Sequence, residues 1–196
     1  TNCTFLANGG GIQTLSYTGS GPLEQCSTTL INCTFKENSS TYGGAIYDLS
    51  GNSEIIDCMF IQNSATYGGA IYTPNKLNLS GCTFTSNSAT YGGAIYVRTG
   101  YVPEESALTL TNCMFTKNAA KDSGGGIYVE NDLAVKIIDS TILCNTPNAI
   151  EGPFSASVAS CIRDDCFLCD PDGDYDGDGV VTVLDWLEFL SNQPWF

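Results

Sequence analysis

The chain has 196 residues, of which 21 are Asp or Glu and 7 are Lys or Arg, so its formal net charge is −14. This acidic balance argues against binding to nucleic acids or anionic lipids, because both need clustered cations. There is no histidine, so imidazole serves neither as a catalytic base nor as a metal ligand. Because 42% of the residues are hydrophobic, the chain can bury a core, and no apolar run approaches the length of a membrane span.

A short motif containing cysteine, phenylalanine and asparagine recurs along the first 150 residues. It stands at 2–8 (NCTFLAN), 32–38 (NCTFKEN), 57–63 (DCMFIQN), 81–87 (GCTFTSN) and 112–118 (NCMFTKN), with a weaker copy at 139–145 (DSTILCN). Each copy precedes a glycine-led segment such as YGGAIY, and the last of these fades into NAI. Aligned cysteines are roughly 24 to 31 residues apart, which is the length of one coil of a solenoid.

Within each repeat, apolar residues alternate with polar ones, which predicts strands rather than helices. Cys and Phe alternate in the motif, Leu77 and Leu79 alternate upstream of it, and isoleucine should face inward in the glycine-led segment. The residue before each motif cysteine is Asn, Asp or Gly, which tolerate a positive φ, so the chain should turn there. Three short strands per coil predict an all-β protein, a parallel β-helix of about six coils over residues 1–150.

The ten cysteines fall into two sets. Those of the motif should stack along one corner, either within disulfide range of each other or as small buried thiols that fill the corner, and we expect reduced thiols. The repeated asparagines should hydrogen-bond along the solenoid. The remaining cysteines are predicted to form disulfides in an oxidising compartment, with a pairing that the sequence does not determine. They are Cys26, Cys144, Cys161, Cys166 and Cys169.

Phe-x-x-Asn followed by Gly-Gly-Ala-Ile resembles the repeats of chlamydial polymorphic outer-membrane proteins and of other bacterial right-handed β-helix surface proteins. It stands here as Phe35-x-x-Asn38 with 43–46, Phe60-x-x-Asn63 with 68–71, and Phe84-x-x-Asn87 with 92–95. The resemblance covers about residues 2–150. It implies a right-handed β-helix in an extracellular location, and for many such proteins a role in adhesion.

The chain becomes acidic towards its end, and we expect a Cys-rich connector at 151–169 and a calcium-binding segment at 170–196. Residues 174–185 fit the twelve-position EF-hand loop, with carboxylates at positions 1, 3 and 5 and glycine at 6. A short helix should follow the loop. The segment resembles one repeat of a type I dockerin, which also ends its loop with Asp, and a second cation site is considered near Asp170 and Asp172. The predicted calcium ligands are Asp174, Asp176, Asp178, the carbonyl of Val180, Thr182 and Asp185.

Tyrosine follows the inward isoleucine at the same place in four coils. These residues should face outward and stack as a strip, and a second strip is expected beside them. Outward aromatic strips bind sugar rings or a neighbouring molecule, or they only shield the sheet beneath, and both interpretations are open. The first strip is Tyr47, Tyr72, Tyr96 and Tyr128, and the second is Tyr42, Tyr67 and Tyr91.

Polysaccharide-cleaving enzymes need paired carboxylates, and the repeat strands offer only isolated acids, so a non-catalytic protein is predicted. We expect an extracellular, calcium-binding β-helix for cell-surface structure or adhesion, with no insertion into a membrane. The chain begins within a predicted strand, and an uncapped coil exposes unpaired backbone. Its partners should therefore be further copies of itself, added end to end into filaments, or another surface protein. The alternative is a carbohydrate-binding or polysaccharide-processing, lyase-like module.

Overall fold

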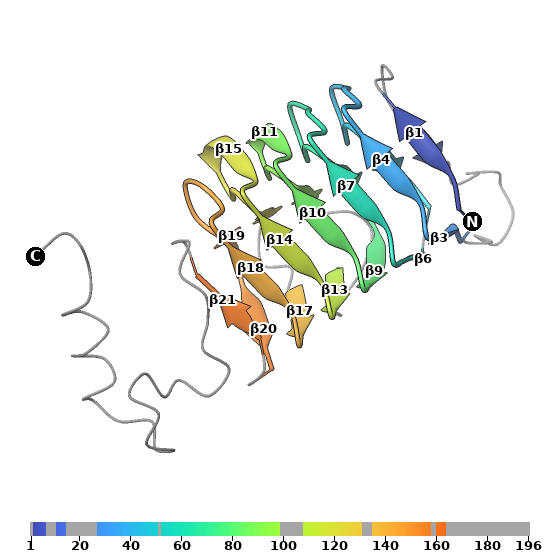
Figure 1. Cartoon of the computed structure of the whole chain (residues 1–196). Coiled ribbons are helices and arrows are strands. Elements are labelled where there is room, and N and C mark those ends of the chain that lie inside the picture. The colour runs from blue at the N-terminus through green and yellow to red at the C-terminus, as the bar shows by residue number, and fades with distance from the viewer. Residues whose placement is uncertain are drawn as a thin grey trace, which may run out of the picture. The chain divides into compact units, whose positions relative to one another are not determined.

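The computed structural model describes residues 2–6, 11–14, 27–50, 52–98, 108–130, 135–157 and 160–163. All of them belong to the first of two compact units, Thr1–Cys166 and Phe167–Phe196. The described residues form strands and turns, and none of them builds a helix that could cross a membrane. Short strands lie side by side in successive coils (Figure 1), which is the arrangement of a parallel β-helix.

Three parallel sheets run along the stack of coils. The phenylalanine sheet consists of β1 (Thr4–Leu6), β4 (Thr34–Lys36), β7 (Met59–Ile61), β10 (Thr83–Thr85), β14 (Met114–Thr116), β18 (Thr141–Leu143) and β21 (Cys161–Ile162). The tyrosine sheet consists of β2 (Ile12–Thr14), β5 (Ile46–Asp48), β8 (Ile71–Thr73), β12 (Ile95–Val97), β16 (Ile127–Val129) and β19 (Ile150–Glu151). The leucine sheet consists of β3 (Thr29–Ile31), β6 (Asn52–Ile56), β9 (Lys76–Ser80), β13 (Leu108–Thr111), β17 (Val135–Ile138) and β20 (Phe154–Ala156). In two coils a further pair, β11 (Ser88–Tyr91) and β15 (Ala119–Ser123), precedes the tyrosine-sheet strand.

The register aligns equivalent residues of successive coils, as a repeat requires. Phe84 pairs with Phe60 on one side and with Phe115 on the other. The predicted parallel stacking of three strands per coil is therefore confirmed. The stack also extends past residue 150, because β19, β20 and β21 pair in parallel with β16, β17 and β18. Strands β19, β20 and β21 therefore reach into residues 151–169, which the sequence predicts as a connector. Backbone hydrogen bonds between coils do not require the repeat motif.

Besides the glycine-led segment, two corners in each coil hold residues at positive φ. The first precedes the motif cysteine, as predicted, with φ between 48° and 54° at Asn2, Asn32, Asp57, Asn112 and Asp139, and Gly81 in the same place. The second precedes the buried asparagine, and its residue types do not predict it. There φ lies between 54° and 58° at Glu37, Gln62, Ser86, Lys117 and Cys144. A left-handed conformation costs such residues about 1–2 kcal/mol, so the surrounding contacts must offset that cost.

Phenylalanine rings form the centre of the core. Phe35, Phe60, Phe84 and Phe115 are fully buried, and their centroids are 5.0, 4.5 and 4.4 Å apart in near-parallel stacks. The partly buried Phe5 continues the stack at 4.7 Å from Phe35. Inward isoleucines of the tyrosine sheet and inward leucines of the leucine sheet complete the same core. Stacking thus buries the inner face that a single coil leaves open.

Buried asparagines form a ladder along the second corner. The side-chain Nδ2 of Asn63 donates to the Phe35 carbonyl at 2.9 Å and to Oδ1 of Asn87 at 3.0 Å. The backbone N–H of Asn63 donates to the same Oδ1 at 2.9 Å. The pattern repeats at Asn38, Asn87 and Asn118. This ladder confirms the predicted structural role of the asparagines and provides the contacts that hold the second corner.

The paired glycines before each tyrosine-sheet strand serve two different purposes. Gly68 has φ of +66°, in the left-handed region that glycine enters without steric cost. A Cβ on Gly69 would instead collide with the carbonyl oxygen of Gly93 and with the backbone of Ser88. Successive coils therefore approach too closely at this point for any side chain, and the glycine pair sets the position of the tyrosines that follow.

Candidate functional site: the tyrosine face

Outward tyrosines follow the inward isoleucines of the tyrosine sheet. The inner column, defined as Tyr47, Tyr72, Tyr96 and Tyr128, is in register along β5, β8, β12 and β16. Its rings lie 5.2 Å (edge-on), 5.5 Å and 5.1 Å from the next. The column ends because Gln13 pairs with Tyr47 at one end and Glu151 pairs with Tyr128 at the other.

The outer column, defined as Tyr42, Tyr67 and Tyr91, comes from the corner just before the glycine pair. These residues form parallel bridges with each other, and their rings stack at 5.3 and 5.9 Å. Each also packs against the inner column, for example Tyr67 against Tyr96 at 5.3 Å in a T-shaped contact. The two columns together make one continuous aromatic surface, called here the tyrosine face.

Burial corrects one expectation about this face. The inner column points away from the core, yet Tyr72 is only 3% exposed and Tyr96 only 8% exposed, because the outer column covers them. Tyr42, by contrast, is 39% exposed. The surface available to a partner therefore comprises the outer column and the half-buried ends of the inner column, Tyr47 and Tyr128, while Tyr72 and Tyr96 support it from below.

Three phenols of the tyrosine face have a raised pKa. Burial raises the pKa of Tyr72, against the opposing effect of a hydrogen bond with Arg98. Burial also raises the pKa of Tyr96, and a hydrogen bond with Asp122 raises that of Tyr91. Arg98 in turn lies 3.9 Å from Glu130 in an ion pair. These three phenols are thus uncharged at physiological pH.

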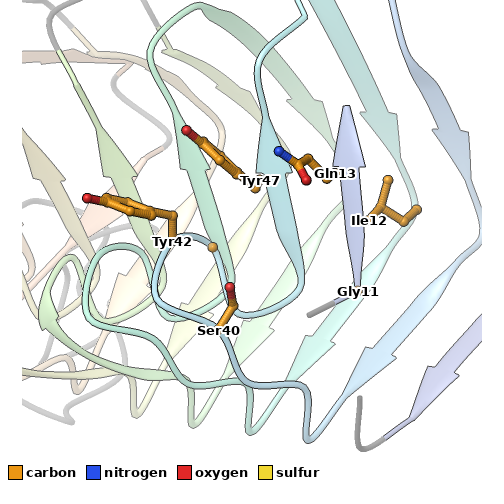
Figure 2. A pocket seen from close by; sticks show the side chains of 7 residues that line it. Gly11, Ile12, Gln13, Ser40, Tyr42 and Tyr47 are labelled. Atoms are coloured by element: carbon orange, nitrogen blue, oxygen red, sulfur yellow. The ribbon is translucent and has the colours of Figure 1, made fainter. Parts of the chain in front are cut away.

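A hollow of about 230 Å³ opens at the end of the tyrosine face nearest the first coil. It is lined by Gly11, Ile12, Gln13, Ser40, Tyr42, Gly43 and Tyr47. Figure 2 shows the Tyr42 and Tyr47 rings extending side by side from the second coil, with Gln13 beside Tyr47 and Ser40 below. Residue patterns did not single out Gln13 or Ser40, although aligning NGGGIQ with YGGAIY shows that the first repeat lacks both tyrosines.

The motif cysteines form a second notable column at the first corner. Cys33, Cys58, Cys82 and Cys113 are buried, and all four are free thiols. Burial raises the pKa of the Cys58 thiol to about 11. The hydrogen bond between Cys82 and Cys113, together with burial, raises the pKa of Cys82, and the same hydrogen bond lowers that of Cys113. Cys58 and Cys82 therefore stay protonated and are poor nucleophiles, and the burial of all four thiols fits their predicted role of filling the corner.

The other predicted site residues lie mostly outside the described part of the chain. That holds for all six calcium ligands, from Asp174 to Asp185, for the neighbouring acids at 170 and 172, and for three of the five remaining cysteines, those at 26, 166 and 169. Cys144 and Cys161 are disulfide-bonded, and disulfide formation by the other three cysteines of the set stays a prediction. Within the described ranges, no group of three or more Cys, Asp or Glu side chains is arranged to hold a metal ion.

The repeats themselves connect this chain to a known family. Four segments, 32–48, 57–74, 81–98 and 112–130, match the model of the Chlamydia polymorphic membrane protein repeat. The chain is similar to that family in its repeats. Each matched segment runs from the phenylalanine-sheet strand through the buried asparagine to the tyrosine-sheet strand. The match fits a location at the cell surface, while no curated protein and no solved structure matches the chain.

Proposed function

We propose that this protein is a non-catalytic β-helix of the cell surface that serves in structure or adhesion and contacts its partners through the tyrosine face. The observation that supports this function is the double column of tyrosines on the outside of repeats that match a surface-associated family. Aromatic rings inside the coils fill the core. The tyrosine rings that stack outside the coils, with Tyr42 exposed, instead supply apolar contact area for another molecule.

The chemistry of the hollow supports a binding role over a catalytic one. Glycosidases act through two carboxyl groups about 5–9 Å apart that flank the substrate. Among the residues that the structure describes, the side chains that line the hollow are an amide, a hydroxyl, two phenols and one aliphatic chain. None of them is a carboxyl group or a strong base, so the hollow offers contacts without an evident acid or nucleophile.

Adhesion is tested with cells that display the full chain. Antibody labelling of intact cells establishes exposure, and beads coated with the purified protein measure adhesion to host cells. Replacing Tyr42 and Tyr67 by Ser should reduce adhesion severalfold, and Ser already occupies this column at Ser123, which pairs with Tyr91. The matched control is Met59→Thr, an exposed position on the phenylalanine sheet where neighbouring coils carry Thr. Labelling only after permeabilisation, or equal losses in both variants, would refute the proposal.

Calcium binding and self-association complete the proposed function. The support for calcium is the spacing of oxygen donors in 174–185, which matches an EF-hand loop. The support for end-to-end contact is that β1, β2 and β3 each pair on one edge only, within the part of the chain that the structure describes. Sedimentation velocity with calcium and then with a chelator tests both. A monomer at every protein concentration in calcium would exclude filament formation.

A further inference from the structure

The hollow beside Tyr42 follows from a difference between the first repeat and those after it. In the second repeat, four residues, Ser-Ser-Thr-Tyr at 39–42, separate the buried asparagine from the glycine pair. The first repeat passes directly from Asn8 to Gly9. It therefore lacks a residue equivalent to Tyr42, and it carries Gln13 where the second coil has Tyr47. Both tyrosine columns stop at the same coil, and the hollow lies where their next rings would stand.

Tyr42 and Tyr47 form the aromatic wall of the hollow, and their rings stack on each other at 5.6 Å with planes 25° apart. Tyr67 of the third coil stacks on Tyr42 at 5.3 Å with planes 12° apart. The hollow lies on the opposite side of Tyr42, because its remaining walls come from Gly11, Ile12 and Gln13 of the first coil. Among the described residues no ring of the first coil stacks on that side. A flat group of suitable size would extend the existing stack by one member.

Polar groups line the hollow beside the Tyr42 and Tyr47 rings. Gln13 offers an amide with two donors and an acceptor, and Ser40 offers a hydroxyl. Both lie within the lining of the same hollow as the two phenols (Figure 2). Among the described residues the lining carries no charged side chain, and the whole chain carries a net charge of −14. A ligand with one apolar face and a rim of uncharged hydroxyl groups matches these contacts, whereas an anionic ligand would be repelled.

We propose that the hollow is a binding site for one neutral pyranose ring of a glycan. The C–H face of the sugar packs against the wall formed by the Tyr42 and Tyr47 rings, and its hydroxyl groups hydrogen-bond with Gln13 and Ser40. The volume of about 230 Å³ is below the 300–1,000 Å³ typical of pockets for larger ligands, so a single ring is held. This inference rests on the proposed function, because it names the class of ligand that the tyrosine face binds.

The test is direct binding of small sugars to the full chain in solution. Saturation-transfer NMR and titration calorimetry would use the methyl glycosides of glucose, galactose and mannose as neutral probes. Glucuronic acid serves as the charged probe and p-cresol as the aromatic one. We expect at least one neutral glycoside to bind, with saturation strongest at its ring C–H protons, and glucuronic acid to bind at least about tenfold more weakly.

Three variants locate the site. Gln13→Tyr continues the inner column into the hollow and should abolish sugar binding while leaving the fold intact, since that column already carries Tyr in the next coil. Tyr42→Ser removes the stacking ring and should weaken binding by about three- to tenfold. Ser40→Ala introduces the residue found at this place in the next two repeats, 65 and 89, and should weaken binding by a smaller factor. Met59→Thr, on another face, should leave binding unchanged.

The outcomes separate this inference from the proposed function. Binding of no neutral glycoside, binding of p-cresol alone, or sugar binding that survives Gln13→Tyr would overturn the sugar site. If tyrosine-dependent adhesion nevertheless persists, the tyrosine face contacts another kind of partner and the proposed function stands. If sugar binds while adhesion is absent, the site is established and the adhesion proposal fails.

Discussion

Substitution of Asn87, a member of the asparagine ladder that is 1% exposed, is predicted to lower the free energy of unfolding. Its Nδ2 donates to the Phe60 carbonyl at 3.0 Å and to Oδ1 of Asn118 at 2.9 Å. Its Oδ1 accepts from the backbone N–H of Asn63 at 2.9 Å and from the Asn63 side chain at 3.0 Å. Asn87→Ala removes all four bonds and leaves two donors of Asn63 without this acceptor in a buried corner. At about 1 kcal/mol for each hydrogen bond lost, and more for a buried group left unpaired, we expect a loss of about 4–6 kcal/mol.

Equilibrium unfolding in guanidinium chloride, followed by circular dichroism, measures this loss. Hydrogen exchange provides a local readout, because the amide of Asn63 should exchange much faster in the variant while the amides of distant coils change less. Ser88→Ala is the control, since Ser88 is exposed and its partner in the next coil is Ala119. A loss below about 1 kcal/mol, or an unchanged exchange rate at Asn63, would show that the ladder does not stabilise the corner.

Phe84→Ala, which deletes the central ring of the buried stack, should cost about 3–5 kcal/mol in the same unfolding assay, and a cost under about 1 kcal/mol would contradict its place in the core. Burial raises the pKa of Cys58 from its ordinary 9.0 to about 11, so the folded state holds this proton more tightly than the unfolded chain. Its contribution to stability should be complete below about pH 9 and be lost as the pH rises towards 11, which denaturation midpoints measured across that range would show. Replacing Asp174 and Asp178 by Ala should abolish calcium binding in titration calorimetry, since an EF-hand needs six or more oxygens, and an unchanged affinity would disprove the assigned loop.

Alternation of residue types was enough to predict the architecture. Inward Phe84 lies two residues from inward Cys82, and inward Leu79 lies two residues from inward Leu77. Asp57 and Asn112, which are left-handed, belong to residue types that favour a turn. The second corner was harder, because Gln62 and Lys117 do not favour positive φ. The available signal was that phenylalanine and asparagine three positions apart are both inside, which a straight strand does not allow.

The candidate site was only half predictable for a related reason. Strand alternation indicates which side chains leave the sheet, so the outward direction of Tyr72 and Tyr96 followed from the isoleucine before each of them. What covers those side chains depends on a neighbouring corner, and the covering residues of the outer column belong to a segment without periodicity. The hollow forms because the first repeat lacks the residues equivalent to Tyr42 and Tyr47. A search for repeated motifs does not detect residues that one repeat lacks.

The amide-to-amide hydrogen bonds of the asparagine ladder all point in one direction along the stack, from Asn38 towards Asn145, while each donating Nδ2 also donates to the phenylalanine carbonyl of the coil before it. Every junction between coils therefore carries the same set of hydrogen bonds. At the last member of the ladder, Asn145 Nδ2 donates to the carbonyl of Leu143 in its own coil, at 2.9 Å, and the series of amide-to-amide hydrogen bonds ends there. A gene duplication or deletion of one whole repeat would therefore create no unmatched polar group at the new junction. The length of this protein can change during evolution in whole coils, while both ends of the stack are preserved.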